Sequence, residues 1–193
     1  MRWEVEGKDA VERALDEDIG SGDITTNACI PADLRAEARF VAKQEITLAG
    51  VELLRILFDD ATLGKSSGDR IQAGEVLATV RADARTLLTR ERVSLNFLQR
   101  LSGIATLAAK FVAAVEGTGV KILDTRKTTP GLRKLEKMAA AAGGVVNHRM
   151  GLFDAILIKN NHIRLAGGVR PAMERTNPLN RPIEIEVRTR AEI

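Results

Sequence analysis

The sequence predicts an N-terminal α+β sandwich domain followed by an incomplete α/β barrel. Three observations lead to this prediction. Short β-prone runs separated by turn residues dominate the first half, short apolar strands recur in the second half at intervals of roughly 30 residues, and the chain has only 193 residues. A closed barrel of eight strands needs about 200 residues or more by itself. We therefore expect the barrel to be unclosed and the chain to be C-terminally truncated.

The composition favours a globular protein that binds small ligands. Hydrophobic residues make up 45% of the chain, which is enough to bury a core. A net charge of +3 with 28% charged residues gives only weak support to nucleic-acid binding. Aromatic residues account for 3% and Tyr is missing, which argues against the base-stacking surfaces of single-strand binders. We expect no nucleic-acid partner.

The cysteine content and the N-terminal sequence indicate in which cellular compartment the protein is expected. The single cysteine, Cys29, excludes an internal disulfide framework and a cysteine-based metal site, and it fits a reducing cytoplasm. Residues 1–6 lack an apolar signal segment, and no run approaches the ~18 apolar residues of a membrane span. We expect a soluble, cytoplasmic protein with no membrane partner.

The first third of the chain mixes helical and extended patterns. Residues 10–18 suit a helix, residues 36–48 alternate loosely as half-buried strands do, and residues 51–58 suit a second helix. Residues 18–26 form a Gly, Ser and Asp loop that must turn tightly. Because no Lys follows this loop and no strand precedes it, a structural turn is favoured over a phosphate-binding loop.

Residues 65–80 contain two turns between short β-prone runs and so resemble one hairpin of a biotinyl or lipoyl carrier sandwich. A swinging-arm carrier needs an exposed Lys at the hairpin tip, and no Lys of this segment stands at such a tip. We interpret the segment as sandwich structure without carrier chemistry. Two helices follow, over residues 85–103 and 106–115, and periodicity alone makes Arg92 a solvated helix charge.

Cationic residues follow the strands of the second half. The elements predicted there are strands over 120–124, 154–159 and 182–187 and a helix over 132–142. Arg126 and Lys127 come just after the first strand, and Lys159 ends the second. In parallel α/β architectures the carboxyl ends of the strands form the edge where chemistry takes place. We therefore place a candidate site at this edge.

Charges in this region need partners. Four cations, Arg126, Lys127, Arg149 and Lys159, would repel one another unless an anion lies among them. On the last strand, Glu184 and Glu186 project to the same face, where a pair of acids is costly without cations or a metal. The pattern indicates a site for an anionic ligand.

The two histidines of the chain lie in the same region. His148 fits a hydrogen-bonded loop histidine and a ligand-binding residue equally well. For His162 a structural role is favoured over metal binding, because no Cys or acidic cluster accompanies it. We predict no metal site built from protein side chains alone.

Seven motifs, in this order along nearly the whole chain, resemble the quinolinate phosphoribosyltransferase family. They are LDEDIGSGDITT at 15–26, ER at 91–92 with LN at 95–96, LSGIAT at 101–106, DTRKTTPG at 124–131, NHR at 147–149, LIK at 157–159 with NH at 161–162, and EIEV at 184–187. Each motif is weak alone, but the ordered set is highly specific.

The resemblance implies a type II phosphoribosyltransferase-like fold. Residues 1–104 would form an α/β sandwich and dimerisation domain, and residues 105–193 the first part of a barrel with fewer than eight strands. The implied reaction transfers the phosphoribosyl group of phosphoribosyl pyrophosphate to quinolinate with decarboxylation, giving nicotinate mononucleotide, pyrophosphate and CO2 in NAD biosynthesis. Mg²⁺ is the implied cofactor. The implied assembly is a homodimer or higher homo-oligomer with shared active sites.

The same resemblance implies which residues bind quinolinate. Arg126 and Arg149 would bind its carboxylates, with help from Thr125 and His148, and Arg92 would enter the site of the neighbouring subunit. This fits the residue chemistry, because a guanidinium group grips a carboxylate through two parallel hydrogen bonds and stays charged.

Three residues would act on the sugar donor. The resemblance implies that Lys127 and Lys159 neutralise phosphoribosyl pyrophosphate and that Glu186 faces the ribose or its Mg²⁺. Glu184 is the alternative acid, but the match of residues 184–187 to the family motif favours Glu186. We predict Lys127, Lys159 and Glu186 as catalytic residues.

The sequence also departs from the family pattern. The family has a further acid and Gly/Ser-rich phosphate loops on later strands, and the sequence ends before them. Residues 139–142 are all Ala where the family is more varied, which we interpret as tolerance on a helix surface. Two alternatives remain open from the sequence: a related phosphoribosyltransferase-like protein with another aromatic acid substrate, and a catalytically incomplete fragment that only dimerises.

Overall fold

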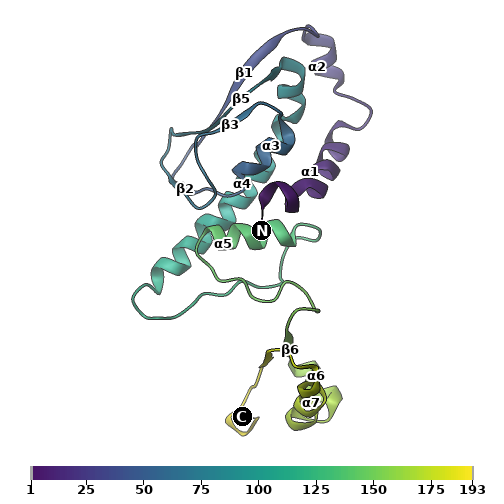
Figure 1. The fold of residues 1–193 in the computed structure, drawn as a ribbon, viewed down its shortest axis with the longest axis vertical. Coiled ribbons are helices and arrows are strands. Elements are labelled where there is room, and N and C mark those ends of the chain that lie inside the picture. The colour runs from purple at the N-terminus through teal and green to yellow at the C-terminus, as the bar shows by residue number, and fades with distance from the viewer. Residues whose placement is uncertain (1, 193) are drawn as a thin grey trace. The chain divides into compact units, whose positions relative to one another are not determined.

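The computed structural model describes residues 2–192, and the chain forms two compact units, Met1–Asn147 and His148–Ile193 (Figure 1). The helices of the first unit are α1 (Trp3–Ile19), α2 (Ile24–Cys29), α3 (Leu54–Leu57, after a 3-10 turn at Val51–Leu53), α4 (Ala84–Ala114) and α5 (Arg133–Ala142). Its strands are β1 (Arg35–Val41), β2 (Ile46–Thr47), β3 (Ala61–Leu63), β4 (Arg70–Ile71) and β5 (Val76–Asp83). The second unit contains β6 (Ile156–Ile158), α6 (Asn160–Ala166), α7 (Val169–Thr176) and β7 (Ile183–Ile185), with 3-10 turns at Asn177–Leu179 and Arg190–Glu192. None of the helices formed by residues 2–192 combines the length and apolar character needed to cross a membrane.

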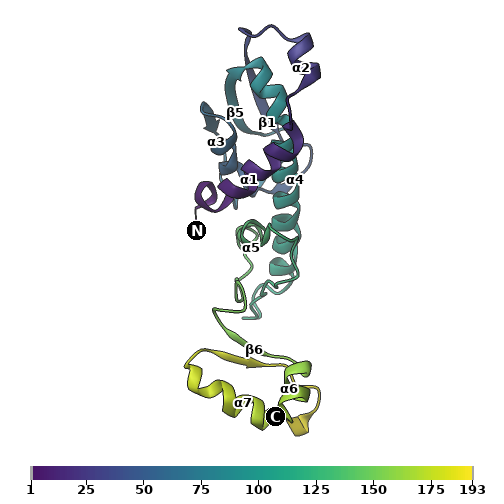
Figure 2. The ribbon, with the colours of Figure 1, turned by 90° about the vertical axis from the view of Figure 1, so that its right-hand side faces the viewer.

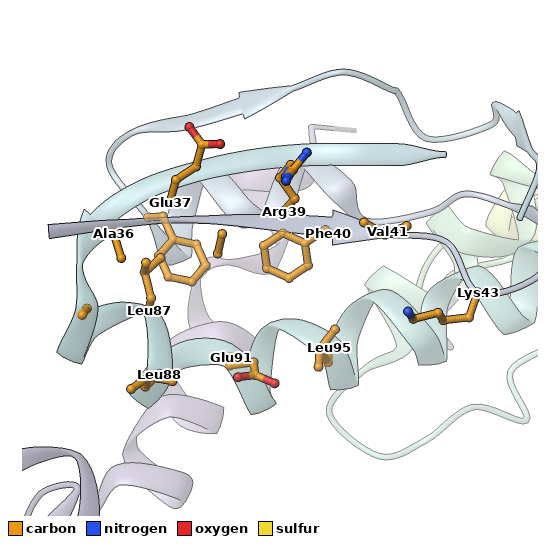
Figure 3. Close-up of a pocket in the computed structure, with 13 residues that line it drawn as sticks. Ala36, Glu37, Arg39, Phe40, Val41, Lys43, Leu87, Leu88, Glu91 and Leu95 are labelled. Atoms are coloured by element: carbon orange, nitrogen blue, oxygen red, sulfur yellow. The ribbon is translucent and has the colours of Figure 1, made fainter. Parts of the chain in front are cut away.

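The main sheet of the first unit is antiparallel and has the strand order β1, β5, β3. Its register places Phe40 opposite Ala78 and Ala38 opposite Val80. Because register partners share a face of the sheet, these four side chains lie on one side. Figure 3 shows the Phe40 ring between β1 and α4, so this is the face that α4 covers. Strands β2 and β4 form a separate antiparallel pair.

The predicted hairpin over residues 65–80 is wrong. The two strands of this segment belong to different sheets, since β4 pairs with β2 and β5 pairs with β1 and β3. The turns are present, but the long pairing of β5 with β1 from Arg35 to Val41 provides more hydrogen bonds than a local hairpin would. Local turn chemistry therefore predicted where the chain turns and not which strands pair.

Helix α4 is continuous from Ala84 to Ala114, whereas the sequence predicted two helices. It starts at Asp83, whose carboxylate accepts a hydrogen bond from the Thr86 N–H at 2.9 Å. Gly103, where the prediction ended the first helix, disfavours a helix by about 1 kcal/mol relative to Ala. Buried Leu101 and Ala105 lie on either side of it, and their packing outweighs that local preference.

The predicted loop over residues 18–26 contains the start of a helix. Asp23 caps α2, because its carboxylate accepts a hydrogen bond from the Thr26 N–H at 2.9 Å. The Thr89 hydroxyl of α4 donates to the same carboxylate at 3.1 Å. The segment is thus structural, as the sequence favoured, and Asp23 ties α2 to α4.

The hydrophobic core of the described chain lies mainly in the first unit, where α5 packs against the second half of α4 (Figure 2). Ala139 is fully buried and Ala140 joins a second cluster with Ala108 of α4. The interpretation of residues 139–142 as a tolerant helix surface is therefore wrong for Ala139 and Ala140, whereas Ala141 is exposed. A methyl group at Gly143 would lie 2.3 Å from the Ala105 carbonyl oxygen, so a residue without Cβ is needed where α5 ends against α4.

The predicted strand over residues 120–124 is also wrong. Only Leu123 forms a β-bridge, to Val146 in parallel orientation. Gly119 has φ +75°, a left-handed conformation that keeps the preceding residues in a turn, and the loop that begins at Thr125 limits the pairing on the other side. A short parallel contact thus replaces the expected strand.

In the second unit, β6 and β7 form a parallel pair with Ile156 opposite Ile183 and Ile158 opposite Ile185. This confirms the centres of the strands predicted over 154–159 and 182–187. Helix α6, which the sequence did not predict, follows β6 directly and contacts α7. Ile158 and Ala172 are buried within the unit.

Candidate active site

In the first unit, two segments that precede predicted site residues run side by side. The Val146 N–H donates to the Ile122 carbonyl oxygen at 2.9 Å, and the Asp124 N–H donates to the Val146 carbonyl oxygen at 3.1 Å. Parallel segments end at the same edge. Asp124 therefore lies beside Asn147, whose side-chain amide donates to Asp124 Oδ2 at 2.6 Å.

Lys137 of α5 completes a buried network at this edge. Its side chain is only 1% exposed and forms an ion pair with the carboxylate of Asp124, which is 7% exposed. The Asn147 amide also donates to the Lys137 carbonyl oxygen at 2.9 Å. Buried charges are tolerated where they are paired and hydrogen-bonded. The network holds Asp124 and Asn147, the last residues of the two parallel segments, next to each other.

The loop after Asp124 carries three predicted site residues. The Thr125 hydroxyl accepts a hydrogen bond from the Lys127 N–H at 2.9 Å, and the Arg126 carbonyl accepts one from the Thr128 N–H at 3.0 Å. Arg126 is half-buried, whereas Thr125 and Lys127 are exposed. The structure thus keeps these three residues together on one short, internally bonded loop.

Glu136 of α5 holds the far end of this loop. Its carboxylate accepts a hydrogen bond from the Thr129 N–H at 3.0 Å and another from Arg100 of α4 at 2.8 Å. Arg100 also donates to the Thr129 hydroxyl at 2.8 Å. Burial raises the pKa of Glu136, but hydrogen bonds from Thr129 and Arg100 outweigh it and hold the pKa below its usual value. Glu136 is therefore an ionised acceptor at neutral pH.

In the second unit, the parallel pair β6–β7 brings Lys159 and Glu186 together. The Glu186 N–H donates to the Ile158 carbonyl oxygen at 2.9 Å, so pairing continues to the strand end. Leu157 is the register partner of Glu184, and side chains alternate along extended chain. Lys159 and Glu186 consequently lie on the same face at the same end, and both are exposed.

Both histidines have acid or backbone partners within the second unit. His148 Nε2 lies 2.9 Å from Glu184 Oε2, which makes His148 a hydrogen-bonded histidine next to the strand that carries Glu186. His162 Nδ1 accepts a hydrogen bond from the Lys159 N–H at 2.8 Å. His162 thus caps α6, a structural role of the kind that the sequence favoured.

Arg126 and Arg149 share one unusual feature. Among residues 2–192, the buried side-chain nitrogen and oxygen atoms without a hydrogen-bond partner are Nε of Arg126 and Nε of Arg149. Arg149 donates from Nη1 to the Ala155 carbonyl oxygen at 3.2 Å, which orients its guanidinium group. A buried donor without an acceptor is costly, and a carboxylate is the acceptor that best matches a guanidinium fork. These are the two arginines predicted to bind substrate carboxylates.

A groove of about 530 Å³ between β1 and α4 is a different kind of site (Figure 3). Apolar side chains such as Phe40, Leu87 and Leu95 line it, and none of the predicted site residues is among its described lining residues. Arg92 lies exposed on α4, about two helical turns before Arg100, and takes no part in the networks above. The charged lining residues of the groove are two cations, Arg39 and Lys43, and two acids, Glu37 and Glu91, so the groove carries no excess positive charge for an anionic ligand.

Metal binding would depend on a ligand as well as the protein. Within the part of the chain that the structure describes, no three His, Cys, Asp or Glu side chains gather into a metal-binding group. Mg²⁺ is often held by one or two carboxylates together with phosphate oxygens of the substrate. Glu186, exposed at the end of a strand, fits that pattern.

Comparison with known proteins identifies the family. The sequence model of the quinolinate phosphoribosyl transferase N-terminal domain matches residues 23–102, and that of the C-terminal domain matches residues 104–193. The chain belongs to the quinolinate phosphoribosyltransferase family. The two matches meet inside α4, so this helix connects the N- and C-terminal domains of the family.

Individual members of the quinolinate phosphoribosyltransferase family are similar throughout the chain. Quinolinate phosphoribosyltransferase (decarboxylating) 1b of Nicotiana tabacum is 42% identical and covers 96% of the chain. Nicotinate-nucleotide pyrophosphorylase (carboxylating) of Mycobacterium leprae is 43% identical and covers 93%. The crystal structure of NadC from Streptococcus pyogenes superposes with a TM-score of 0.91 at 38% identity and covers 98% of the chain. The chain has the two-domain fold of this family.

The chain is shorter than these members of the family. It spans 56% of the length of the tobacco protein, 67% of the Mycobacterium leprae protein and 70% of the Streptococcus pyogenes chain. The similarity therefore concerns only that share of each relative's length.

Sequence reasoning missed the residues that support the site. Lys137 and Glu136 are buried, yet a charged pair within a short helix is typical of a surface helix with one apolar face. All residues from Leu135 to Ala140 are buried, so the middle of α5 is enclosed on every side, whereas Lys134 and Ala141 near its ends are exposed. No pattern in the sequence distinguishes an enclosed helix of this kind. The partnership of Glu184 with His148 was missed for a similar reason, since it joins segments far apart in the sequence.

Proposed function

We propose that the protein transfers the phosphoribosyl group of phosphoribosyl pyrophosphate to quinolinate with decarboxylation, giving nicotinate mononucleotide, pyrophosphate and CO2. Membership of the family makes this the first function to consider. The observation that carries the proposal is made in each unit by itself: Nε of Arg126 in the first unit and Nε of Arg149 in the second are buried and have no hydrogen-bond partner. Two such donors suit the two carboxylates of quinolinate, a planar dicarboxylate.

The proposed reaction needs little covalent chemistry from the protein. The ring nitrogen of quinolinate attacks the anomeric carbon of the donor, the bond from that carbon to the pyrophosphate oxygen breaks, and pyrophosphate leaves with the electron pair. The cationic ring then accepts the electrons of the bond to the adjacent carboxylate, CO2 leaves, and a proton takes its place. The protein's contribution is positioning of both reactants and stabilisation of charge in the transition state.

In this proposal, Arg126 and Arg149 bind the quinolinate carboxylates with assistance from Thr125 and His148. The hydroxyl of Thr125 already accepts the Lys127 N–H, which orients it within the loop. The Glu184 carboxylate fixes the His148 ring by a hydrogen bond at 2.9 Å, as an acid commonly orients a functional histidine. Within each unit, these contacts orient a candidate binding group before any ligand binds.

Lys127, Lys159 and Glu186 are assigned to the sugar donor. The two lysines are exposed cations that would neutralise phosphate charge, and Glu186 would face the ribose, where positive charge develops. Glu186 would also help to hold Mg²⁺, which when bound supplies positive charge to the leaving pyrophosphate. The common face of Lys159 and Glu186 at one strand end supports this assignment.

The architecture and assembly follow the same proposal. Residues 1–104 form a sandwich and dimerisation domain, and residues 105–193 form the first strands of an α/β barrel. Arg92, exposed on α4, enters the active site of the neighbouring subunit in a homodimer or higher homo-oligomer. The cytoplasm is the proposed compartment, because the single cysteine, Cys29, is free and exposed.

The proposal is tested by following CO2 release from carboxyl-labelled quinolinate. We expect release only when phosphoribosyl pyrophosphate and Mg²⁺ are both present, with formation of one nicotinate mononucleotide per CO2. Reactions that lack the sugar donor or contain a chelator serve as controls. Release without the sugar donor would contradict the proposal, and so would a chain that neither releases CO2 nor binds quinolinate.

A further inference from the structure

Helix α5 buries two charged residues next to each other, which is unusual for a helix of ten residues. Glu136 is 6% exposed and Lys137 is 1% exposed, whereas Lys134 on the same helix is exposed and pairs with Glu6 of α1 at 2.8 Å. Burial of a charge is costly unless its partners are well placed. The partners of Glu136 and Lys137 therefore indicate what the two residues do.

The partners of Lys137 and Glu136 lie at the two ends of the loop that carries Arg126. Lys137 forms its ion pair with Asp124, the residue before the loop, and Glu136 accepts from the N–H of Thr129, where the loop ends. The hydrogen bonds inside the loop span only two residues each. Helix α5 thus holds both ends of the loop, and its first residue, Arg133, also donates to the Thr128 hydroxyl at 3.2 Å.

We propose that Glu136 and Lys137 are positioning residues that hold this loop at its two ends and so fix the place of Arg126 and Lys127 for an anionic ligand. The network on the Lys137 side also includes Asn147, which donates to both Asp124 and the Lys137 carbonyl oxygen. Small displacements of binding groups reduce activity strongly, by about a hundredfold for 1 Å. The inference rests on the proposed function only for the identity of the ligand, quinolinate.

Two variants of the 193-residue chain test the two ends of the loop. Lys137→Met combined with Asp124→Asn removes the ion pair without leaving a buried charge unpaired. Glu136→Gln removes the charge of the acceptor at the other end. The control is Lys134→Met, which removes an exposed lysine of the same helix that pairs with Glu6 of α1. Circular dichroism establishes that each variant is folded.

The first readout is amide hydrogen exchange and needs no ligand. In both test variants we expect the amides of residues 127–129 to exchange at least about tenfold faster, while the amides at the centre of α4 keep their wild-type rates. The control variant should match the wild type. Unchanged exchange in the loop, or an equal increase throughout the first unit, would overturn the inference.

The second readout is quinolinate affinity, measured by calorimetric titration. Each test variant should bind at least about tenfold more weakly than the wild type, and this loss should disappear when Arg126 is already replaced by Ala. A loss that persists in full in the Arg126→Ala background would show that α5 does not act through the loop and would overturn the inference. If the wild type itself binds no quinolinate, the proposed function fails, and loop exchange alone decides the role of Glu136 and Lys137.

Discussion

Each unit contains a pair of parallel segments, but the contacts at the ends of these segments differ between the two units. In the first unit, the segment ending at Asp124 lies parallel to the segment ending at Asn147, and in the second unit β6 lies parallel to β7. Each pair brings chemistry-bearing residues to one edge. The first pair ends in a buried ion pair with Lys137, whereas the second ends in Lys159 and Glu186, which are exposed.

This difference shows that bringing two strand ends together and holding the loop at those ends in one conformation depend on different contacts. Parallel pairing is sufficient to bring two strand ends together, because the carboxyl ends of neighbouring strands share an edge. Holding a loop at that edge in one conformation requires further contacts, and in the first unit α5 supplies them through Glu136 and Lys137. We therefore expect the two edges to respond very differently to equivalent substitutions.

The largest expected difference concerns the two lysines. Lys137→Met removes the ion pair of the buried Asp124 carboxylate and should reduce the free energy of unfolding by about 3–5 kcal/mol. Lys159→Met removes an exposed cation and should change it by less than about 0.5 kcal/mol. Urea denaturation followed by circular dichroism measures both. Equal effects of the two substitutions would contradict the difference in burial.

The next largest difference is expected between truncation of a buried leucine in the first unit and truncation of an exposed leucine in the second. Leu135 of α5 is 1% exposed, and Leu135→Ala should destabilise the first unit by about 2–5 kcal/mol through lost burial and a residual cavity. Leu165 of α6 is 83% exposed, and Leu165→Ala should stay within about 0.5 kcal/mol of the wild type. Thermal unfolding provides the measurement, and a large loss for Leu165→Ala would show that this residue is covered in solution.

A smaller effect should appear in acid. The pKa of Glu136 is lower in the folded chain than its usual value of about 4.5, so the unfolded chain takes up its proton first as the pH falls. The stabilisation by this carboxylate is complete above that usual value and is lost as the pH falls through the folded pKa. Glu136→Gln should therefore make stability less dependent on pH below about 4.5. Denaturation curves from pH 7 to pH 3 with the same acid dependence in both proteins would refute this.

The smallest expected effect is a stabilisation of the first unit by a substitution in α4. Gly103 lies in the interior of α4, is exposed, and has open space around the position of a Cβ. Gly103→Ala should raise the free energy of unfolding of the first unit by about 0.5–1 kcal/mol, because Ala loses less conformational freedom in a helix. Gly143→Ala is the contrasting variant, since its methyl group would meet the Ala105 carbonyl oxygen of α4. Destabilisation by Gly103→Ala would mean that α4 is not continuous at this residue.

Much of the candidate site was predictable from the sequence. The sequence correctly predicted Lys159 at the end of a strand and, from the alternation at residues 183–187, a common face for Glu184 and Glu186. Arg126 and Lys127 instead follow a segment that forms only a β-bridge at Leu123. The correct predictions depend on short-range periodicity, which the backbone enforces locally.

The supporting contacts were not predictable, because they join residues that are distant in the sequence. The burial of Lys137 depends on Asp124 and Asn147, and the continuity of α4 through Gly103 depends on packing against α5. The same limit explains the hairpin error at residues 65–80, where β5 pairs with β1. Tertiary contacts overrode local preference at each of these places.

The central proposal is that Arg126 and Arg149 bind the two carboxylates of quinolinate. It is tested most directly by calorimetric titration of quinolinate with the wild type and with Arg149→Ala. The matched control is Arg175→Ala, since Arg175 also donates to a backbone carbonyl within the second unit, at 3.1 Å from the Ala166 oxygen. We expect Arg149→Ala to weaken binding by at least about tenfold, which corresponds to a lost charge-assisted hydrogen bond, and Arg175→Ala to leave it unchanged. Equal affinity of the wild type and Arg149→Ala for quinolinate would contradict the claim.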